Sequence, residues 1–278
     1  MNKSMIQLDE RNLAHIFSAL ALCGIADDRF PCGQSCCWWA NDAFLMCLPN
    51  TKNELFEEAD RFVRNINWTR GIGVDPNDKM HKKITTSPHH GLFTADGRYF
   101  GNPLISCHDQ GASSTVFKTF SGQKGPDEIL EKQKTTVTAP VIGKPDDWLF
   151  QRAKGVASWK FDARVGGHAY SQGFSANDDG SGDQTPFYPA IELLSIAGAA
   201  FFSTPTTWLM DEDTLTYAVW RKEIPLRLAP LAASNLLDGV DAVVYNLATS
   251  GNAYGKGGAY RHFPDASPLT FHKTLQPQ

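Results

Sequence analysis

The sequence lacks the motifs that mark several common classes of enzyme and metal protein. It has no GxxxxGK run for nucleotide phosphates, no HExxH or HxH spacing for a hydrolytic metal, and no CxxC pair for structural zinc. The longest apolar runs, around residues 14–25 and 191–202, are too short to span a bilayer. No secretory signal pattern stands at the amino terminus. We therefore expect a cytoplasmic protein that contacts no membrane, and the sequence gives no sign of a nucleotide cofactor or a catalytic metal bound through such motifs.

Charged residues are few and slightly acidic in balance. Of the 278 residues, 20% are charged and 42% hydrophobic, which is typical of a globular chain with a core. The net charge of −4 argues against strong binding of nucleic acid by this chain alone. However, residues 78–164 hold 13 Lys and Arg against 9 Asp and Glu. Such a local basic surface suits a subunit with a short nucleic-acid footprint, and a chance fluctuation of a few charges is the alternative.

Six cysteines are present, and five of them fall within residues 23–47. Structural zinc usually requires spaced pairs, whereas Cys36 and Cys37 are adjacent. We therefore predict buried, reduced thiols and keep a metal site as the alternative.

Hydrophobic periodicity predicts both helices and strands along the chain. The expected helices are residues 11–26, 52–66, 126–133, 189–202 and 225–237. The expected strands are residues 36–39 and 43–48, which resemble a hairpin, and residues 159–163, 214–220 and 240–247. These elements predict an α+β fold with a mixed or antiparallel sheet and buried helices. The chain divides into residues 1–150 and 151–278, or forms one body.

The most distinctive stretch is residues 158–175, SWKFDARVGGHAYSQGFS. It begins as a strand with an apolar face and a charged face, the latter carrying Lys160, Asp162 and Arg164. Glycines then break the pattern and predict a loop that carries His168 and Tyr170. Glycine allows close approach of a backbone, and these side chains donate hydrogen bonds without adding negative charge. The stretch therefore fits contact with a phosphate backbone, and an ordinary strand end with a flexible turn is the alternative.

Three other segments have similar chemistry. Residues 75–101 lack periodicity and read as a long basic loop, residues 117–125 form a polar loop ahead of a helix start, and residues 250–264 interleave glycine with aromatic and basic residues. The residues that we expect to contact nucleic acid are Lys82, Lys83, Lys118, Gln123, Lys124, Lys160, Arg164, His168, Tyr170, Lys256 and Arg261.

Four sequence blocks, in this order, resemble a known family. They are LAHIFSALALCGIADD, FKTFSGQ, FDARVGGHAYSQGFS and YPAIELLSIAGAAFF. Together they are similar to blocks of the Csb-type, large-subunit-like proteins of type I-U (also called I-G) CRISPR-Cas systems, over roughly residues 11–262. The resemblance implies a non-catalytic subunit of Cascade, the crRNA-guided complex that binds foreign DNA.

The resemblance also implies partners and a position. The partners would be crRNA, target double-stranded DNA, the backbone and foot subunits of Cascade, and the helicase-nuclease that the complex recruits. The chain would lie near the crRNA 5′ handle and the protospacer-adjacent motif (PAM). The family assignment extends to six of the expected contact residues, namely Lys118, Gln123, Lys160, Arg164, His168 and Tyr170.

Two other functions stay open from the sequence. A crRNA-processing nuclease would use His108, His168 or His262 as a general base, although no pairing among these histidines is visible. A purely structural assembly protein would need no contact with nucleic acid. His15, inside the first predicted helix, is expected to be a surface or hydrogen-bonded histidine rather than a ligand.

Overall fold

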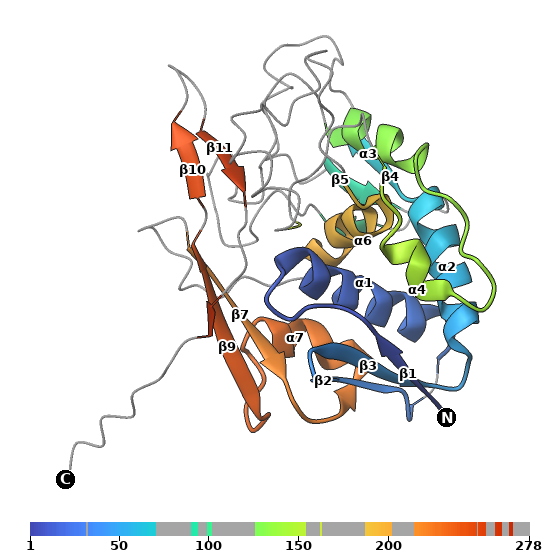
Figure 1. The fold of residues 1–278 in the computed structure, drawn as a ribbon. Helices are drawn as coiled ribbons and strands as arrows, with labels where there is room; N and C mark the ends of the chain where they lie inside the picture. The colour runs from blue at the N-terminus through green and yellow to red at the C-terminus, as the bar shows by residue number, and fades with distance from the viewer. Residues whose placement is uncertain are drawn as a thin grey trace.

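The structure of the chain is a computed structural model. It describes residues 1–31, 33–70, 90–93, 99–101, 126–153, 162, 187–201, 214–248, 250–253, 259–262 and 267–268. The fold is α+β, as the sequence predicts, and the strand pairs of the described residues are antiparallel. Figure 1 shows the arrangement of its helices and sheets.

The first sheet contains four strands in the order β1, β3, β2, β8. Their bounds are β1 Asn2–Ile6, β2 Cys36–Ala40, β3 Ala43–Leu48 and β8 Ile224–Pro225. The predicted hairpin of β2 and β3 is confirmed, and it closes through Asn41 and Asp42, with φ angles of 51° and 55°. Asn and Asp tolerate positive φ, which is what a two-residue hairpin turn requires. Residue 40, expected in the connection, ends β2 instead.

Two buried helices cross above this sheet (Figure 1). They are α1, Leu13–Arg29, and α6, Pro189–Ala199, both predicted from the sequence. Small side chains allow their close contact, since Ser195 Oγ donates to the Ala14 carbonyl at 2.9 Å and Ser18 Oγ donates to the Ile191 carbonyl at 3.2 Å. The two helices therefore form the centre of the hydrophobic core.

Three further helices lie on one side of α1 and α6 (Figure 1). They are α2 Lys52–Asn65, α3 Pro126–Lys134 and α4 Pro145–Leu149. The predicted capping box of α2 is confirmed, because Thr51 and Glu54 bond reciprocally across the first turn. The helix predicted over residues 225–237 is shorter than expected, consisting of η2 Leu226–Leu228 and α7 Ala229–Ala233.

A second sheet has the order β12, β9, β7. Its strands are β7 Thr214–Trp220, β9 Ala242–Ala248 and β12 Ser267–Pro268, of which the sequence predicted the first two. It contacts the first sheet through Trp220, whose Nε1 donates to the Cys37 carbonyl at 3.0 Å. The Trp220 ring also packs edge-on against Trp39 and Phe44 at centroid distances of 6.4 and 6.2 Å.

Residues 75–101 are not a continuous loop, so that prediction was wrong in part. Two strands fall in this range, β5 His90–Phe93 and β6 Tyr99–Gly101, and they extend a sheet begun by β4 Asn67–Arg70. Glycine and proline near residues 88–97 favour a loop locally, and the apolar runs of β5 and β6 are too short to predict strands from the sequence. Pairing with β4, which lies before the basic segment, supplies the partner that a short strand needs.

The described parts of residues 250–264 are strands rather than a glycine-rich loop. Strand β10, Ser250–Ala253, pairs with β11, Ala259–His262, so that Arg261 stands opposite Gly251 in the register. Hairpin pairing is compatible with small residues on one strand when the other strand supplies residues such as Tyr and His. Arg261 therefore belongs to a strand rather than to a loop.

Elements from both sides of residue 150 contribute to the main core. Helix α6 packs on α1, and β8 pairs with β2. The division near residue 150 stays a prediction. No helix in the described ranges is both long and apolar enough to cross a membrane.

Gly198 provides a test of the contact between α1 and α6. A Cβ atom at this position would lie 1.7 Å from the Phe17 carbonyl oxygen, so the helices would have to separate. We expect Gly198→Ala to reduce the free energy of unfolding by about 3 kcal/mol. Gly33→Ala is the control, because its Cβ would meet no atom within 4 Å. Urea denaturation followed by tryptophan fluorescence measures both, and equal midpoints would contradict the close packing.

Candidate functional site

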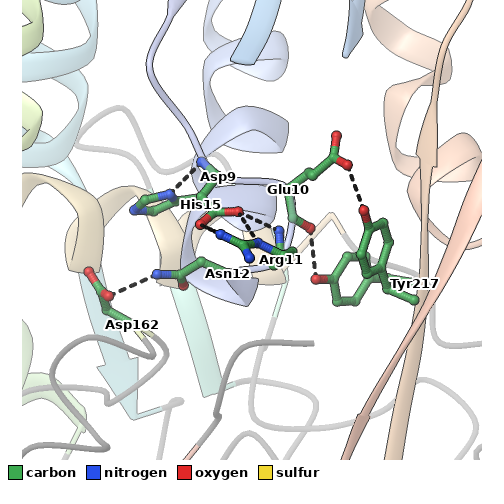
Figure 2. A network of polar contacts seen from close by, with 8 residues as sticks. Asp9, Glu10, Arg11, Asn12, His15, Asp162 and Tyr217 are labelled. Atoms are coloured by element: carbon green, nitrogen blue, oxygen red, sulfur yellow. Dashed lines mark hydrogen bonds and ion pairs between the residues drawn. The ribbon is translucent and has the colours of Figure 1, made fainter. Parts of the chain in front are cut away.

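Residues 9–12, Asp-Glu-Arg-Asn, connect β1 to α1 and form the centre of a polar cluster (Figure 2). Asn12 is the N-cap of α1, and its Oδ1 accepts the Ala14 N–H at 3.1 Å. Asp9 accepts bonds from the backbone N–H and the guanidinium of Arg11. His15 lies in the first turn of α1, and its Nδ1 accepts the Asp9 N–H at 2.7 Å. The histidine is thus hydrogen-bonded, as the sequence predicts.

Glu10 has the most elaborate environment of the four residues. Glu10 is only 5% exposed. Both of its carboxylate oxygens accept hydrogen bonds from Arg221, the residue that follows β7, at 2.5 and 2.7 Å. Tyr245 of β9 donates to the same carboxylate at 2.5 Å, and Tyr217 of β7 donates to the Glu10 backbone carbonyl at 2.8 Å. The two tyrosine rings stack at a centroid distance of 5.5 Å. Glu10 therefore joins the start of α1 to the second sheet.

The electrostatics of this cluster favour a charged Glu10. Burial alone would raise the pKa of its carboxyl, but the bonds from Arg221 and Tyr245 outweigh burial and hold the pKa below its usual range. Burial, followed by the bond to Glu10, raises the pKa of Tyr245 to about 12. Tyr245 consequently stays protonated and donates its hydrogen bond at any physiological pH.

Asp162 connects the distinctive stretch 158–175 to the same cluster. Its side chain is fully buried, and its Oδ1 accepts a bond from Asn12 Nδ2 at 2.9 Å (Figure 2). The sequence assigned Asp162 to a charged strand face, and its burial is a correction. A buried carboxylate requires a partner, and Asn12 supplies one while it also caps α1.

The β10 and β11 hairpin is connected to the same cluster at Glu10, two residues before Asn12 in the chain. Tyr245, which bonds to Glu10, lies in β9, and β9 leads after residue 249 into the β10 and β11 hairpin that carries Arg261. Two residues of chain span at most about 7 Å. The attachment points of both glycine-rich segments, at Glu10 and Asn12, therefore lie close together.

Most predicted contact residues lie outside the described residues. These are Lys82, Lys83, Lys118, Gln123, Lys124, Lys160, Arg164, His168, Tyr170 and Lys256. Arg261 is placed in β11, although only its backbone is described. Of the histidines considered for catalysis, His108 and His168 are outside the described residues and His262 ends β11.

Sequence reasoning missed the cluster itself. Glu10 belongs to a run of charged residues before a helix, which is usually solvated, and Arg221 follows a predicted strand. Asn12 before an apolar helical pattern was the only usable signal, since Asn is a favoured N-cap. The pairing of Glu10 with Arg221 spans more than 200 residues of chain and has no local signature.

The cysteines form two pairs of thiols. Side chains of adjacent strand residues point to opposite faces, and so Cys37 meets Cys23 of α1 at 3.6 Å between sulfurs, while Cys36 stands opposite Cys47 in the register. These four are free; Cys23 and Cys37 are buried as predicted, whereas Cys36 and Cys47 are half-buried. In the part of the chain that the structure describes, no group of three or more His, Cys, Asp or Glu is placed to hold a metal ion.

Comparison of the chain with protein-family models, with curated proteins and with solved structures finds no match.

The two tyrosines of the cluster test its energetics. Tyr245→Phe removes a hydrogen bond to a charged carboxylate, and we expect a loss of about 2 kcal/mol in the free energy of unfolding. Tyr217→Phe removes a bond to a neutral carbonyl and is the matched control, with an expected loss of about 1 kcal/mol. Urea denaturation of both variants at neutral pH measures the difference. A larger loss for Tyr217→Phe would contradict a charged Glu10.

The lowered pKa of Glu10 predicts a specific pH dependence. Its stabilising contribution is complete above the unfolded-state pKa of about 4.3 and is lost as the pH falls through the lower folded-state pKa. We therefore expect Glu10→Gln to cost about 3 kcal/mol at pH 7, because Arg221 loses its charged partner. The difference from the unmodified protein should shrink below about pH 4. Denaturation curves between pH 3 and pH 7 provide the measurement, and a constant difference would overturn the assignment.

Proposed function

We propose that this chain is a non-catalytic subunit of a crRNA-guided, DNA-binding Cascade complex. It contacts the crRNA 5′ handle region, the PAM of the target DNA, or both. One observation carries the proposal, namely that residues 9–12 bond both to Asp162 in the stretch 158–175 and to Tyr245 in the strand that leads to β10 and β11. Two segments with nucleic-acid-binding chemistry are thereby attached at one place.

Rigid attachment supports such a role for physical reasons. Phosphate contacts orient a protein on nucleic acid, and their geometry depends on the elements that hold the contacting loops. The bonds from Arg221 and Tyr245 to Glu10 are charge-assisted and largely buried, so they restrain the second sheet and the start of α1 strongly. Glycine in both attached segments then leaves room for a phosphate backbone to approach.

The acidic balance of the chain supports a subunit rather than an independent binding protein. A net charge of −4 gives weak non-specific attraction to phosphate. In guided recognition, base pairing reads the sequence and the protein subunits hold backbones and inspect a short motif. Partner subunits and crRNA would supply most of the affinity in this arrangement.

The first experiment is a pull-down of the tagged chain from its native host, followed by sequencing of the co-purified RNA. We expect a set of backbone and foot subunits together with repeat-derived RNA of uniform length. Recovery of the chain alone and free of RNA would remove the basis of the proposal. Recovery with protein partners whose RNA and target binding do not depend on the two segments would favour a structural assembly protein.

A charge reversal in β11 tests the contact surface within that complex. We expect Arg261→Glu to weaken target binding and to reduce the slope of log K against log salt by about one unit. Lys144→Glu is the matched control, because Lys144 is exposed at the start of α4, across the molecule from β10 and β11 (Figure 1). The complex should assemble with either variant, and equal salt slopes for both would argue against contact through β11.

His262→Ala tests the nuclease alternative. We expect the variant to leave any RNA processing intact, and loss of RNA processing in the variant would favour the nuclease.

A further inference from the structure

The far end of α1 borders a cavity that residues 9–12 do not touch. Its volume is about 340 Å³, within the range of small-ligand pockets. Apolar side chains from α1, α2, η2 and α7 line it, together with Phe201 just after α6. The two aromatic rings in this lining, Phe62 and Phe201, are both half-buried.

Gly24 determines the shape of one wall. A Cβ atom at this position would lie 3.2 Å from Cε2 of Phe201, closer than ordinary van der Waals contact. The glycine therefore allows the Phe201 ring to lie against α1. Glycine in a helix interior costs about 1 kcal/mol relative to alanine, so its presence here has a packing reason.

Four charged side chains surround the cavity: Asp27, Asp28, Arg29 and Arg227. Arg29 forms ion pairs with Asp28 and with Glu58 of α2, both at 3.7 Å. In contrast to Arg29 and Asp28, neither Asp27 nor Arg227 has an ion pair or a side-chain hydrogen bond in the described part of the chain. The cavity thus presents an acceptor, the Asp27 carboxylate, and a donor, the Arg227 guanidinium, beside two aromatic rings.

We propose that this cavity binds a single nucleotide whose base carries an exocyclic amino group. The rings of Phe62 and Phe201 offer aromatic contact to an unstacked base. The Asp27 carboxylate accepts from an amino group and cannot donate to a carbonyl at the same position. The Arg227 guanidinium binds the phosphate.

The nucleotide is either free or part of single-stranded RNA. A base inside a duplex cannot enter the cavity, because its faces and its pairing edge are occupied. The RNA-borne form rests on the proposed function, whereas the free form does not. Since both forms share the same base and phosphate chemistry, one set of ligands tests the site.

Calorimetric titration of the full chain with CMP and with UMP is the test. The two nucleotides have nearly the same shape: CMP has an amino group at C4 and an N3 without hydrogen, whereas UMP has a carbonyl at C4 and an N3–H, so a preference for CMP requires that Asp27 contacts the group at C4. We expect CMP to bind about tenfold more tightly than UMP. The absence of saturable binding of CMP with a Kd below about 1 mM would overturn the proposal.

Substitutions at Asp27 and Arg227 separate the roles of the carboxylate and the guanidinium, and both side chains are exposed, so the core is not disturbed. Asp27→Leu should remove the preference for CMP over UMP and leave UMP binding unchanged. Arg227→Glu should weaken CMP about tenfold and leave the nucleoside cytidine unaffected. Lys144→Glu is the control and should change neither affinity. Binding that none of these substitutions alters would also overturn the site.

The pull-down distinguishes the source of the nucleotide. If Asp27→Leu changes the affinity of the chain for its co-purified RNA, the RNA-borne form is supported. If CMP binds but the chain is recovered without RNA, the site takes a free nucleotide and the proposed function fails alone. If the RNA is recovered but CMP does not bind, this inference fails and the proposed function stands.

Discussion

The buried carboxylate of Glu10 is the constraint on which the arrangement of the molecule depends. Removal of a carboxylate from water carries a large cost unless its oxygens are fully bonded, and here Arg221 and Tyr245 provide those bonds. The second sheet must therefore lie where its side chains reach the start of α1. Because Asn12 follows two residues later and holds Asp162, the same short segment also fixes where the stretch 158–175 enters the fold.

Helix α1 carries this constraint through the core. It is buried along most of its length between the first sheet and α6, and 17 helical residues extend about 25 Å. The polar cluster lies at its beginning and the cavity of about 340 Å³ at its end. If both ends contact the same RNA strand, the rigid helix sets the distance between the two contacts, and the footprint of the proposed subunit follows from the helix length rather than from loop conformation.

Under the proposed function, a short footprint would reconcile the acidic chain with contact to nucleic acid. Local contacts at two sites need only a few cations and aromatic rings, while the affinity of a guided complex comes from many subunits and from base pairing. In the proposed subunit, this division of roles would make the attachment of the two segments more important than their number of positive charges.

The sequence by itself determined the local elements: the capping box of α2, the proline at the start of α6, the turn of the β2 and β3 hairpin, and the apolar period of α1. Each depends on residues only a few positions apart, so the signal is complete within one segment. Only the tertiary structure decided that Asp162 is buried, that Glu10 meets Arg221 and Tyr245, that β5 pairs with β4, and that Asp27 and Arg227 border one cavity. These contacts join residues far apart in the chain, and a carboxylate before a helix has the same local pattern whether water or a distant guanidinium is its partner.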